Sequence, residues 1–274
     1  MLPLSIEGIP DEFVAQFDLG ATATIFYENA LKNYYKKYPD LAAKIDTTNT
    51  SRQFDLPRYM LRNVTVVIDS IPSPVSDFVV YKNFGEEIPV DSMGLPSTKL
   101  IGSIGADFCR NKFLIIDYPR ERLCLTDTLP ERLFRQFEWV NCKIERGRIK
   151  VPFTFGKETH DLMFDTGSSL FPVVTDSLHW QRYADLEAGP IDTLKVPAWG
   201  SWVTVYGVPL KVPLAIGQQL FKNQHVNSIP GDDNAAFFLR EQVQGLTGNA
   251  LFLHETIVLD FIQDRFGLWK HNQG

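Results

Sequence analysis

The chain has 274 residues, of which 44% are hydrophobic and 22% are charged, and its formal net charge is −6. This composition is typical of a globular protein and argues against disorder, and the length suffices for one large domain or two lobes with a sizeable core. The negative charge, without a basic cluster rich in aromatics, argues against nucleic acid or an anionic membrane as a partner. No apolar run reaches the roughly 18 residues of a transmembrane helix, so we expect no membrane span.

The first residues, MLPLSIEGIPDEF at 1–13, have neither the basic region nor the long apolar region of a signal peptide. This fits a cytoplasmic protein, or a secreted or periplasmic protein in a trimmed mature form, and the compartment stays open. Cys109, Cys124 and Cys142 do not have the spacing of a zinc site. We expect buried thiols, with a single Cys109–Cys124 disulfide as the alternative.

Short β-strands dominate the predicted elements, which run along the chain with two short helices among them. The alternation of β-branched and aromatic residues predicts strands at 64–69, 113–117, 202–206 and 256–261. Apolar residues three and four positions apart predict helices at 28–38 and 176–186, the second with Asp176 as its N-cap. The segment GDDNAA at 231–236 is interpreted as a surface turn. A mainly β protein follows.

The chain also contains an internal repeat. FVAQFDLGATATIF at 13–26 aligns with HDLMFDTGSSLFPV at 160–173, which places Asp18 on Asp165. Further on, IGADFCRNKFLIIDYPRERLCL at 104–125 aligns with TGNALFLHETIVLDFIQDRFGL at 247–268, which places Gly105 on Gly248. The order and spacing of these features are similar in the two halves. We therefore predict two lobes of related design, 1–127 and 128–274, with a boundary within 126–137.

These segments resemble the aspartic protease family, in its pepsin-like and retropepsin-like forms. An apolar strand, then Asp-Thr-Gly-Ser and a short helix, is similar to the active-site loop of that family. The segment GLTGNALFLHETIVLDFIQDRFGLW at 245–269 is similar to its C-terminal signature, and 99–125 resembles the same element in bacterial and retroviral-type relatives. The resemblance implies two β-barrel-like lobes with a few short helices and an interlobe cleft. The middles of the two halves, about 40–98 and 187–244, carry no recognisable motif.

The resemblance also implies a catalytic pair, Asp18 from one lobe and Asp165 from the other. Two carboxylates about 3 Å apart share one proton, because like charges so close cannot both ionise. The ionised member can take a proton from the attacking water, and the protonated member can donate to the scissile carbonyl oxygen. The expected function is that of a monomeric aspartic endopeptidase, a hydrolase that acts on a peptide or protein without metal or other cofactor.

The loop residues around the two aspartates have expected roles. Gly20 and Gly167 allow the tight turn that brings a backbone amide to each carboxylate. In the family, the residue after the Asp is Thr or Ser, whose hydroxyl hydrogen-bonds across the lobe interface. Thr166 fits that role, whereas Leu19 has no hydroxyl and departs from the pattern.

The next loop position also differs between the halves. It is Ala21 in the first and Ser168 in the second, and Ser168 has a hydroxyl that can hydrogen-bond to the carboxylate of Asp165. The loss of the hydroxyl at Leu19 leaves open a second class of function, a catalytically weak or inactive relative that serves as a peptide-binding module.

Aspartic proteases also close a β-hairpin flap over the substrate. The segment 196–210 has hairpin character, with Trp199 and Trp202 flanking a Gly-Ser turn, and both are candidates for substrate contact. The counterpart in the first half lies near 55–67 and offers Tyr59. Ordinary sheet aromatics are the alternative for all three side chains.

Other polar residues favour structural roles. The five histidines have no metal-ligand spacing, and HETIV at 254–258 lacks the second histidine of a zinc-protease helix. Asp117 and Asp260 recur in both halves near the end of a closing strand, where a hydrogen-bonded structural carboxylate is expected.

Overall fold

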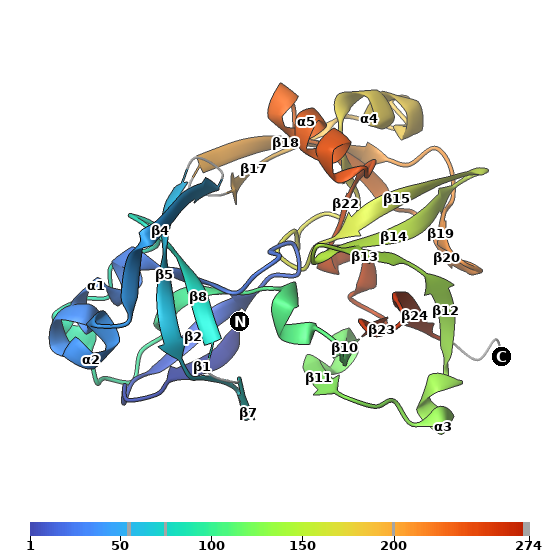
Figure 1. Cartoon of the computed structure of the whole chain (residues 1–274). Helices are drawn as coiled ribbons and strands as arrows, with labels where there is room; N and C mark the ends of the chain where they lie inside the picture. Colours follow the sequence, from blue (N-terminus) through green and yellow to red (C-terminus); the bar gives the residue numbers. More distant parts are fainter. Residues whose placement is uncertain (54–55, 74–75, 199–200, 271–274) are drawn as a thin grey trace. The chain divides into compact units, whose positions relative to one another are not determined.

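The computed structural model describes residues 1–53, 56–73, 76–198 and 201–270 (Figure 1). The chain divides into two compact units, unit 1 (Met1–Phe108) and unit 2 (Cys109–Gly274). The lobe boundary at 127/128 was placed from the sequence repeat, and it stays a prediction. The compact units divide earlier, because the strand that follows Cys109 pairs with strands near the C-terminus.

Unit 1 is built on one nine-stranded sheet with the order β4-β5-β8-β3-β9-β2-β1-β6-β7. Its elements, in chain order, are β1 (Leu2–Ile6), β2 (Glu12–Phe17), β3 (Ile25–Tyr27), α1 (Glu28–Lys37), α2 (Pro39–Ala42), β4 (Ile45–Gln53), β5 (Leu56–Val64), β6 (Val66–Ile68), β7 (Ile71–Pro72), β8 (Ser76–Tyr81), the 3-10 turn η1 (Val90–Ser92), β9 (Leu100–Ile104) and the 3-10 turn η2 (Ala106–Cys109), which crosses into unit 2.

Unit 2 contains a large sheet and a smaller one. Its elements, in chain order, are β10 (Phe113–Asp117), η3 (Tyr118–Arg120), β11 (Arg122–Thr126), α3 (Glu131–Phe134), β12 (Phe137–Asn141), β13 (Lys143–Glu145), β14 (Arg148–Phe155), β15 (Glu158–Phe164), β16 (Val174–Thr175), α4 (Ser177–Tyr183), β17 (Asp192–Ala198), β18 (Ser201–Pro209), β19 (Leu214–Ile216), β20 (Gln219–Phe221), β21 (His225–Ser228), α5 (Asp232–Glu241), β22 (Gly245–Thr247), η4 (Asn249–Phe252), β23 (Thr256–Asp260) and β24 (Arg265–Trp269).

The large sheet of unit 2 repeats the strand order of unit 1. Its order is β17-β18-β21-β16-β22-β15-β14-β19-β20, with β13 paired to β14 outside this path. Each position matches one in unit 1, and the chain visits the matching strands in the same sequence. The two parallel pairings of β2 with β9 and of β3 with β8 also recur, as β15 with β22 and β16 with β21. The sequence repeat and the topology therefore describe the same duplication.

The helices form where their sequences allow an apolar face. Helix α1 buries Ala30, Leu31 and Tyr34, which lie at helical spacing on one side. Helix α4 begins after Asp176, whose side chain accepts a hydrogen bond from the backbone N–H of His179 at 2.8 Å. Both predicted helices are confirmed. The predicted surface turn at 231–236 is wrong, because α5 begins at Asp232.

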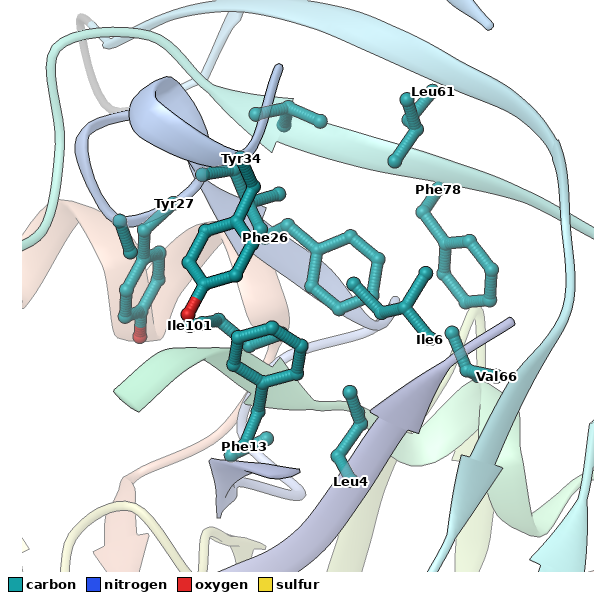
Figure 2. Close-up of a cluster of buried hydrophobic side chains, with 14 of the residues drawn as sticks. Leu4, Ile6, Phe13, Phe26, Tyr27, Tyr34, Leu61, Val66, Phe78 and Ile101 are labelled. Carbon is teal, nitrogen blue, oxygen red and sulfur yellow. The ribbon is translucent and has the colours of Figure 1, made fainter. Parts of the chain in front are cut away.

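Aromatic and aliphatic side chains from the strands and α1 form the core of unit 1 (Figure 2). The rings of Phe13 and Tyr34 meet edge to face with centroids 5.0 Å apart, and those of Phe26 and Phe78 lie 5.1 Å apart. Complete burial of one such side chain contributes about 1.5–3 kcal/mol. The core therefore holds α1 against the strand from which the Asp18 loop leaves.

Several predictions need correction at the level of the elements. The protein is mainly β with a few short helices, as predicted, but each large sheet has two edge strands among the described residues and neither closes into a barrel. The strand predicted at 64–69 is split between β5 and β6 at Thr65. Cys109 and Cys142 are buried as predicted, whereas Cys124 is exposed on β11, and none of the three forms a disulfide.

No helix within the described residues has the length and apolar character needed to cross a bilayer.

Candidate active site

Asp18 follows β2 directly and is held by its backbone. The N–H of Asp18 donates to the carbonyl of Ile104 at 3.0 Å, which extends the parallel pairing of β2 with β9 by one bond. The N–H of Ala21 donates to the carbonyl of Asp18 at 3.1 Å and also to its carboxylate Oδ1 at 3.1 Å. The side chain is 6% exposed. The turn thus fixes a buried carboxylate at the carboxyl end of a central strand.

Asp165 occupies the same position in unit 2. Its N–H donates to the carbonyl of Thr247 at 2.9 Å, which extends the parallel pairing of β15 with β22. The N–H of Gly167 donates to Oδ1 of Asp165 at 2.7 Å, and the N–H of Ser168 donates to its carbonyl at 3.1 Å. Backbone amides directed at a carboxylate favour its ionised form. The two loops therefore present an aspartate at the same place in the sheet, with a backbone amide on each carboxylate, from the third residue after Asp18 and from the second residue after Asp165.

Two glycines of each repeat allow the strands to approach these loops. A Cβ on Gly105 would lie 2.5 Å from the carbonyl carbon of Ala23, and one on Gly248 would lie 1.6 Å from the carbonyl oxygen of Ser168. Such distances exclude any side chain, so the loop packs directly on the glycine backbone. Gly102 and Gly245 likewise leave no room for a Cβ beside the carbonyls of the neighbouring strands. The sequence signal for these positions is the spacing of the glycines, which is the same at 102–105 and 245–248.

The side chains that surround the two loops differ. In unit 1, the Thr24 hydroxyl donates to Asp107 at 2.9 Å and accepts from the N–H of Gly105 at 3.2 Å. In unit 2, the amide of Asn249 donates to the carbonyl of Thr166 at 2.9 Å and to the hydroxyl of Ser169 at 2.7 Å. The sequence did not single out these residues, because each set is specific to one repeat.

Tyr27 and Ser103 form a second polar contact in unit 1. Their hydroxyls lie 2.8 Å apart, and both side chains are buried. Burial raises the pKa of Tyr27; the hydrogen bond with Ser103 opposes this rise, and the negative charge of Asp18 adds to it. Tyr27 therefore stays a neutral hydroxyl within the electrostatic field of Asp18.

The residues after the two aspartates are both buried. Leu19 is completely buried, and Thr166 is 5% exposed. Burial is the environment expected of a leucine side chain, and Leu19 is not one of the residues of the unit 1 core cluster. Asp18 with Gly20 and Ala21 lies in unit 1, and Asp165 with Gly167 and Ser168 lies in unit 2.

The hairpin predicted at 196–210 is β17–β18 of unit 2. Its counterpart in unit 1 is β4–β5, and the predicted range 55–67 covers only the second strand of that hairpin. Tyr59 lies within β5 and is 4% exposed, and its hydroxyl donates to that of Tyr35 at 3.3 Å. Its ring belongs to the core and offers little surface to a ligand. Trp202 lies near the start of β18 and is 72% exposed, which leaves it available for contact. Trp199 lies outside the described residues.

The remaining candidate residues have structural partners. Asp260 is fully buried and accepts hydrogen bonds from the guanidinium of Arg265 and the N–H groups of Ile262 and Gln263. This confirms the structural role predicted for it, and Asp117 likewise bonds to neighbouring side chains. No group of three or more metal-binding side chains occurs in the part of the chain that the structure describes.

Two histidines of unit 2 lie in a polar cluster beside α4. His160 bonds to the hydroxyl of Tyr183, which donates to Glu158 at 3.0 Å, and His179 bonds to Asp176 at 2.9 Å. Burial and the neighbouring His179 lower the pKa of His160. His160 of β15 therefore links this strand to α4 through Tyr183, whereas His179 bonds to the N-cap of its own helix and packs against His160, with ring centroids 5.7 Å apart.

Comparison with models of known protein families and with curated proteins found no match for this chain.

Proposed function

We propose that this protein is an aspartic endopeptidase in which Asp18 and Asp165 act as one catalytic pair. The observation that carries the proposal is the matched construction of the two loops. Each aspartate follows a central strand, bonds through its N–H to the neighbouring parallel strand and receives a backbone N–H on its carboxylate. A duplicated loop that presents a carboxylate twice supplies the two groups that the reaction needs.

The proposed chemistry follows from two carboxylates that share one proton. The ionised aspartate removes a proton from water as the oxygen attacks the scissile carbonyl carbon, and the protonated aspartate donates its proton to the carbonyl oxygen. The tetrahedral intermediate then collapses: the aspartate that took the proton from water gives it to the leaving amine nitrogen as the C–N bond breaks, and the other aspartate recovers its proton from the hydroxyl that becomes the carboxyl carbonyl. In this proposal the fold is pepsin-like, the substrate is an extended peptide, and the protein acts as a monomer. The exposed ring of Trp202 contacts the substrate.

A peptide-binding module without catalytic activity is the second candidate. Leu19 favours it, because a buried leucine supplies no hydroxyl to hold the loop of Asp18. A displacement of about 1 Å in a catalytic group can lower a rate roughly a hundredfold. Both candidate functions require binding of an extended peptide, and they differ only in whether the bound peptide is cleaved.

The test is incubation of a denatured protein with the purified chain at a series of acidic to near-neutral pH values. A statine-type peptide, which imitates the tetrahedral intermediate, is added to half of the samples. Endopeptidase activity predicts fragments whose formation the statine-type peptide suppresses. Binding of the statine-type peptide without any cleavage at any pH would support the binding module and contradict the protease.

A further inference from the structure

The closing hairpins of the two repeats, β10–β11 and β23–β24, are neighbours in the five-stranded sheet of unit 2. Strands β10 and β23 are antiparallel, and Ile115 lies opposite Val258, its own counterpart in the repeat. A local two-fold axis through this pair therefore relates the two hairpins. Asp117 lies opposite Thr256, so the end of β10 is beside the start of β23 and close to η4, which precedes it.

Tyr118 follows β10 directly and contacts the first residue of η4. Its N–H donates to the carbonyl of Glu255 at 3.2 Å, which ties the backbone of Tyr118 to the turn after η4. Its hydroxyl lies 2.6 Å from Oδ1 of Asn249, with which η4 begins. Both side chains are half-buried. A tyrosine of the first repeat therefore bonds to the residue that follows Gly248 in the second.

The other end of the Asn249 side chain contacts the loop of Asp165. Nδ2 donates to the carbonyl of Thr166 at 2.9 Å and to the hydroxyl of Ser169 at 2.7 Å. The Ser169 hydroxyl donates in turn to the same carbonyl at 2.7 Å. Asn249 therefore supports the Thr166 carbonyl directly and also through Ser169, and both lone pairs of this oxygen are used.

The chemistry of the groups fixes the direction of these hydrogen bonds. A backbone carbonyl can only accept, so the amide of Asn249 turns its NH2 group to Thr166 and its oxygen to Tyr118. The amide oxygen also can only accept, so the hydroxyl of Tyr118 donates. Burial raises the pKa of Tyr118. The hydroxyl therefore keeps its proton over the whole range in which an aspartate titrates.

The series of hydrogen bonds ends on the carboxylate of Asp165. The carbonyl of Thr166 and the N–H of Gly167 belong to one trans peptide group and point in opposite directions. That N–H donates to Oδ1 of Asp165 at 2.7 Å. Each bond in such a series polarises the next and strengthens it. We call it the Asp165 relay: the Tyr118 hydroxyl, the Asn249 amide, the 166–167 peptide group and the Asp165 carboxylate.

The sequence of the first repeat does not provide the same relay for Asp18. The repeat alignment places Ala106 on Asn249 and Phe261 on Tyr118. Alanine and phenylalanine have no side-chain donor or acceptor. The two aspartates therefore differ in the side chains that support their loops.

We propose that Tyr118 and Asn249 are positioning residues for Asp165. They hold the 166–167 peptide group with its N–H directed at the carboxylate, and they polarise that N–H, which favours the ionised form of Asp165. The part that this plays in proteolysis rests on the proposed function. The effect on the carboxyl group itself does not require that the protein cleave any substrate.

The test follows the titration of Asp165 by the 13C resonance of its carboxyl carbon, in an Asp18→Asn background that removes coupling to the second aspartate. Tyr118→Phe removes one hydroxyl and keeps the ring. The titration midpoint of Asp165 should rise by roughly 0.1–0.7 of a pH unit, because the relay loses the polarisation that the hydroxyl supplies. Tyr183→Phe removes another hydrogen-bonded hydroxyl of unit 2 and is the matched control, with an unchanged midpoint.

A second substitution separates the relay from a general loosening of the fold. Asn249→Ala removes the side-chain donor to the Thr166 carbonyl and should raise the midpoint more than Tyr118→Phe does. In the Asn249→Ala background, Tyr118→Phe should have no further effect, because its hydroxyl acts through Asn249. A merely structural role of the tyrosine would give the same shift in both backgrounds.

Two results of the titration would overturn the proposal. The first is a midpoint in Tyr118→Phe equal to that of the Tyr183→Phe control, and the second is the same shift from Tyr118→Phe with and without Asn249.

The pH profile of cleavage tests the role in proteolysis separately. If the wild-type chain cleaves a denatured protein, the profile of kcat/KM should move to higher pH in Tyr118→Phe, because a higher midpoint at one member raises the apparent values of the pair. An unmoved profile would contradict the role in proteolysis. If the wild-type chain cleaves nothing, the proposed function fails, and the carboxyl titration still decides whether the relay acts on Asp165.

Discussion

At the scale of single residues, Asp11, Tyr34 and Lys99 form a buried polar cluster in unit 1. Their exposed fractions are 5%, 0% and 4%. The Tyr34 hydroxyl donates to Oδ2 of Asp11, and Nζ of Lys99 lies 3.8 Å from the same oxygen. Burial by itself would raise the pKa of Asp11. Hydrogen bonds from Tyr34 and the backbone of Gly94, with the charge of Lys99, outweigh burial and hold this pKa below its usual value.

This cluster predicts a contribution to acid sensitivity. Since the pKa of Asp11 is lower in the folded chain than the value near 3.9 of an unfolded one, the unfolded chain binds the proton first. The ionised carboxylate therefore stabilises the fold above about pH 4, and this contribution is lost as the pH falls through the folded pKa. In the Asp11→Asn variant, the free energy of unfolding, measured by urea denaturation, should decrease less steeply as the pH drops below about 4. An unchanged pH dependence would contradict the assignment.

Leu19 gives a second prediction for a single residue. Because the side chain is completely buried, Leu19→Ala removes apolar contacts and should lower the free energy of unfolding by about 2–5 kcal/mol. Leu19→Met keeps the volume and should cost less than about 1.5 kcal/mol. Denaturant unfolding monitored by tryptophan fluorescence measures both. If alanine costs no more than methionine, the buried contacts of the Leu19 side chain do not contribute to stability.

At the scale of elements, the glycines beneath the two aspartate loops are the most constrained positions. A Cβ at Gly248 would meet a backbone carbonyl at 1.6 Å, whereas one at Gly267 would first meet a methyl group of Val258 at 2.6 Å. A side chain can change its rotamer, but the carbonyl of Ser168 belongs to the turn after Asp165 and cannot move without moving that turn. The clash is therefore relieved only by displacement of the loop.

Gly248→Ala is consequently expected to destabilise the protein more than Gly267→Ala, and also to displace the Asp165 loop. Thermal unfolding measures the first effect, and amide chemical shifts of Gly167 and Ser168 measure the second. Gly267→Ala is the matched control, since it lies in the same unit. Similar melting temperatures for the two variants, with unchanged loop shifts, would show that the close approach is not a constraint.

The sequence predicted the elements whose signals are local. Helices α1 and α4 and strands β10 and β23 lie where residue periodicity placed them, and Asp176 caps α4. Helix α5 was missed because the Gly-Asp-Asp start at 231–233 has the composition of a turn, and the apolar run that completes the helix comes later. Cys124 was expected to be buried, but it is exposed on β11 at the edge of the five-stranded sheet, and no local pattern records the place of a strand in its sheet.

The residues of the candidate site also divide into those with a signal in the sequence and those without one. Asp18, Asp165 and the glycines of the loops could be predicted from the repeat, because the repeat is visible in the sequence. The hydrogen bonds to the carbonyls of Ile104 and Thr247 could not be predicted from the sequence, since any residue can supply a backbone acceptor. Tyr59 satisfied the aromatic pattern of a hairpin, yet the pattern does not distinguish a core ring from an exposed one.

At the scale of the whole molecule, the chain contains one design twice. The nine strands of the main path have the same order in each large sheet, and the closing hairpins meet about a local two-fold axis. The duplication is imperfect, because α5 has no counterpart α-helix among the described residues of the first repeat. A duplicated fold that presents the same carboxylate loop twice is the basis of the proposed catalytic pair.

The most direct test of that pair is the cleavage of a denatured protein by Asp18→Asn and by Asp165→Asn, at the pH where the wild-type chain is most active. Each substitution keeps the size of the side chain and removes its acid–base chemistry, and circular dichroism confirms that each variant is folded. Loss of one general acid or base lowers a rate by about 10²–10⁴, so each variant should lose cleavage. Full activity in either folded variant would contradict the account.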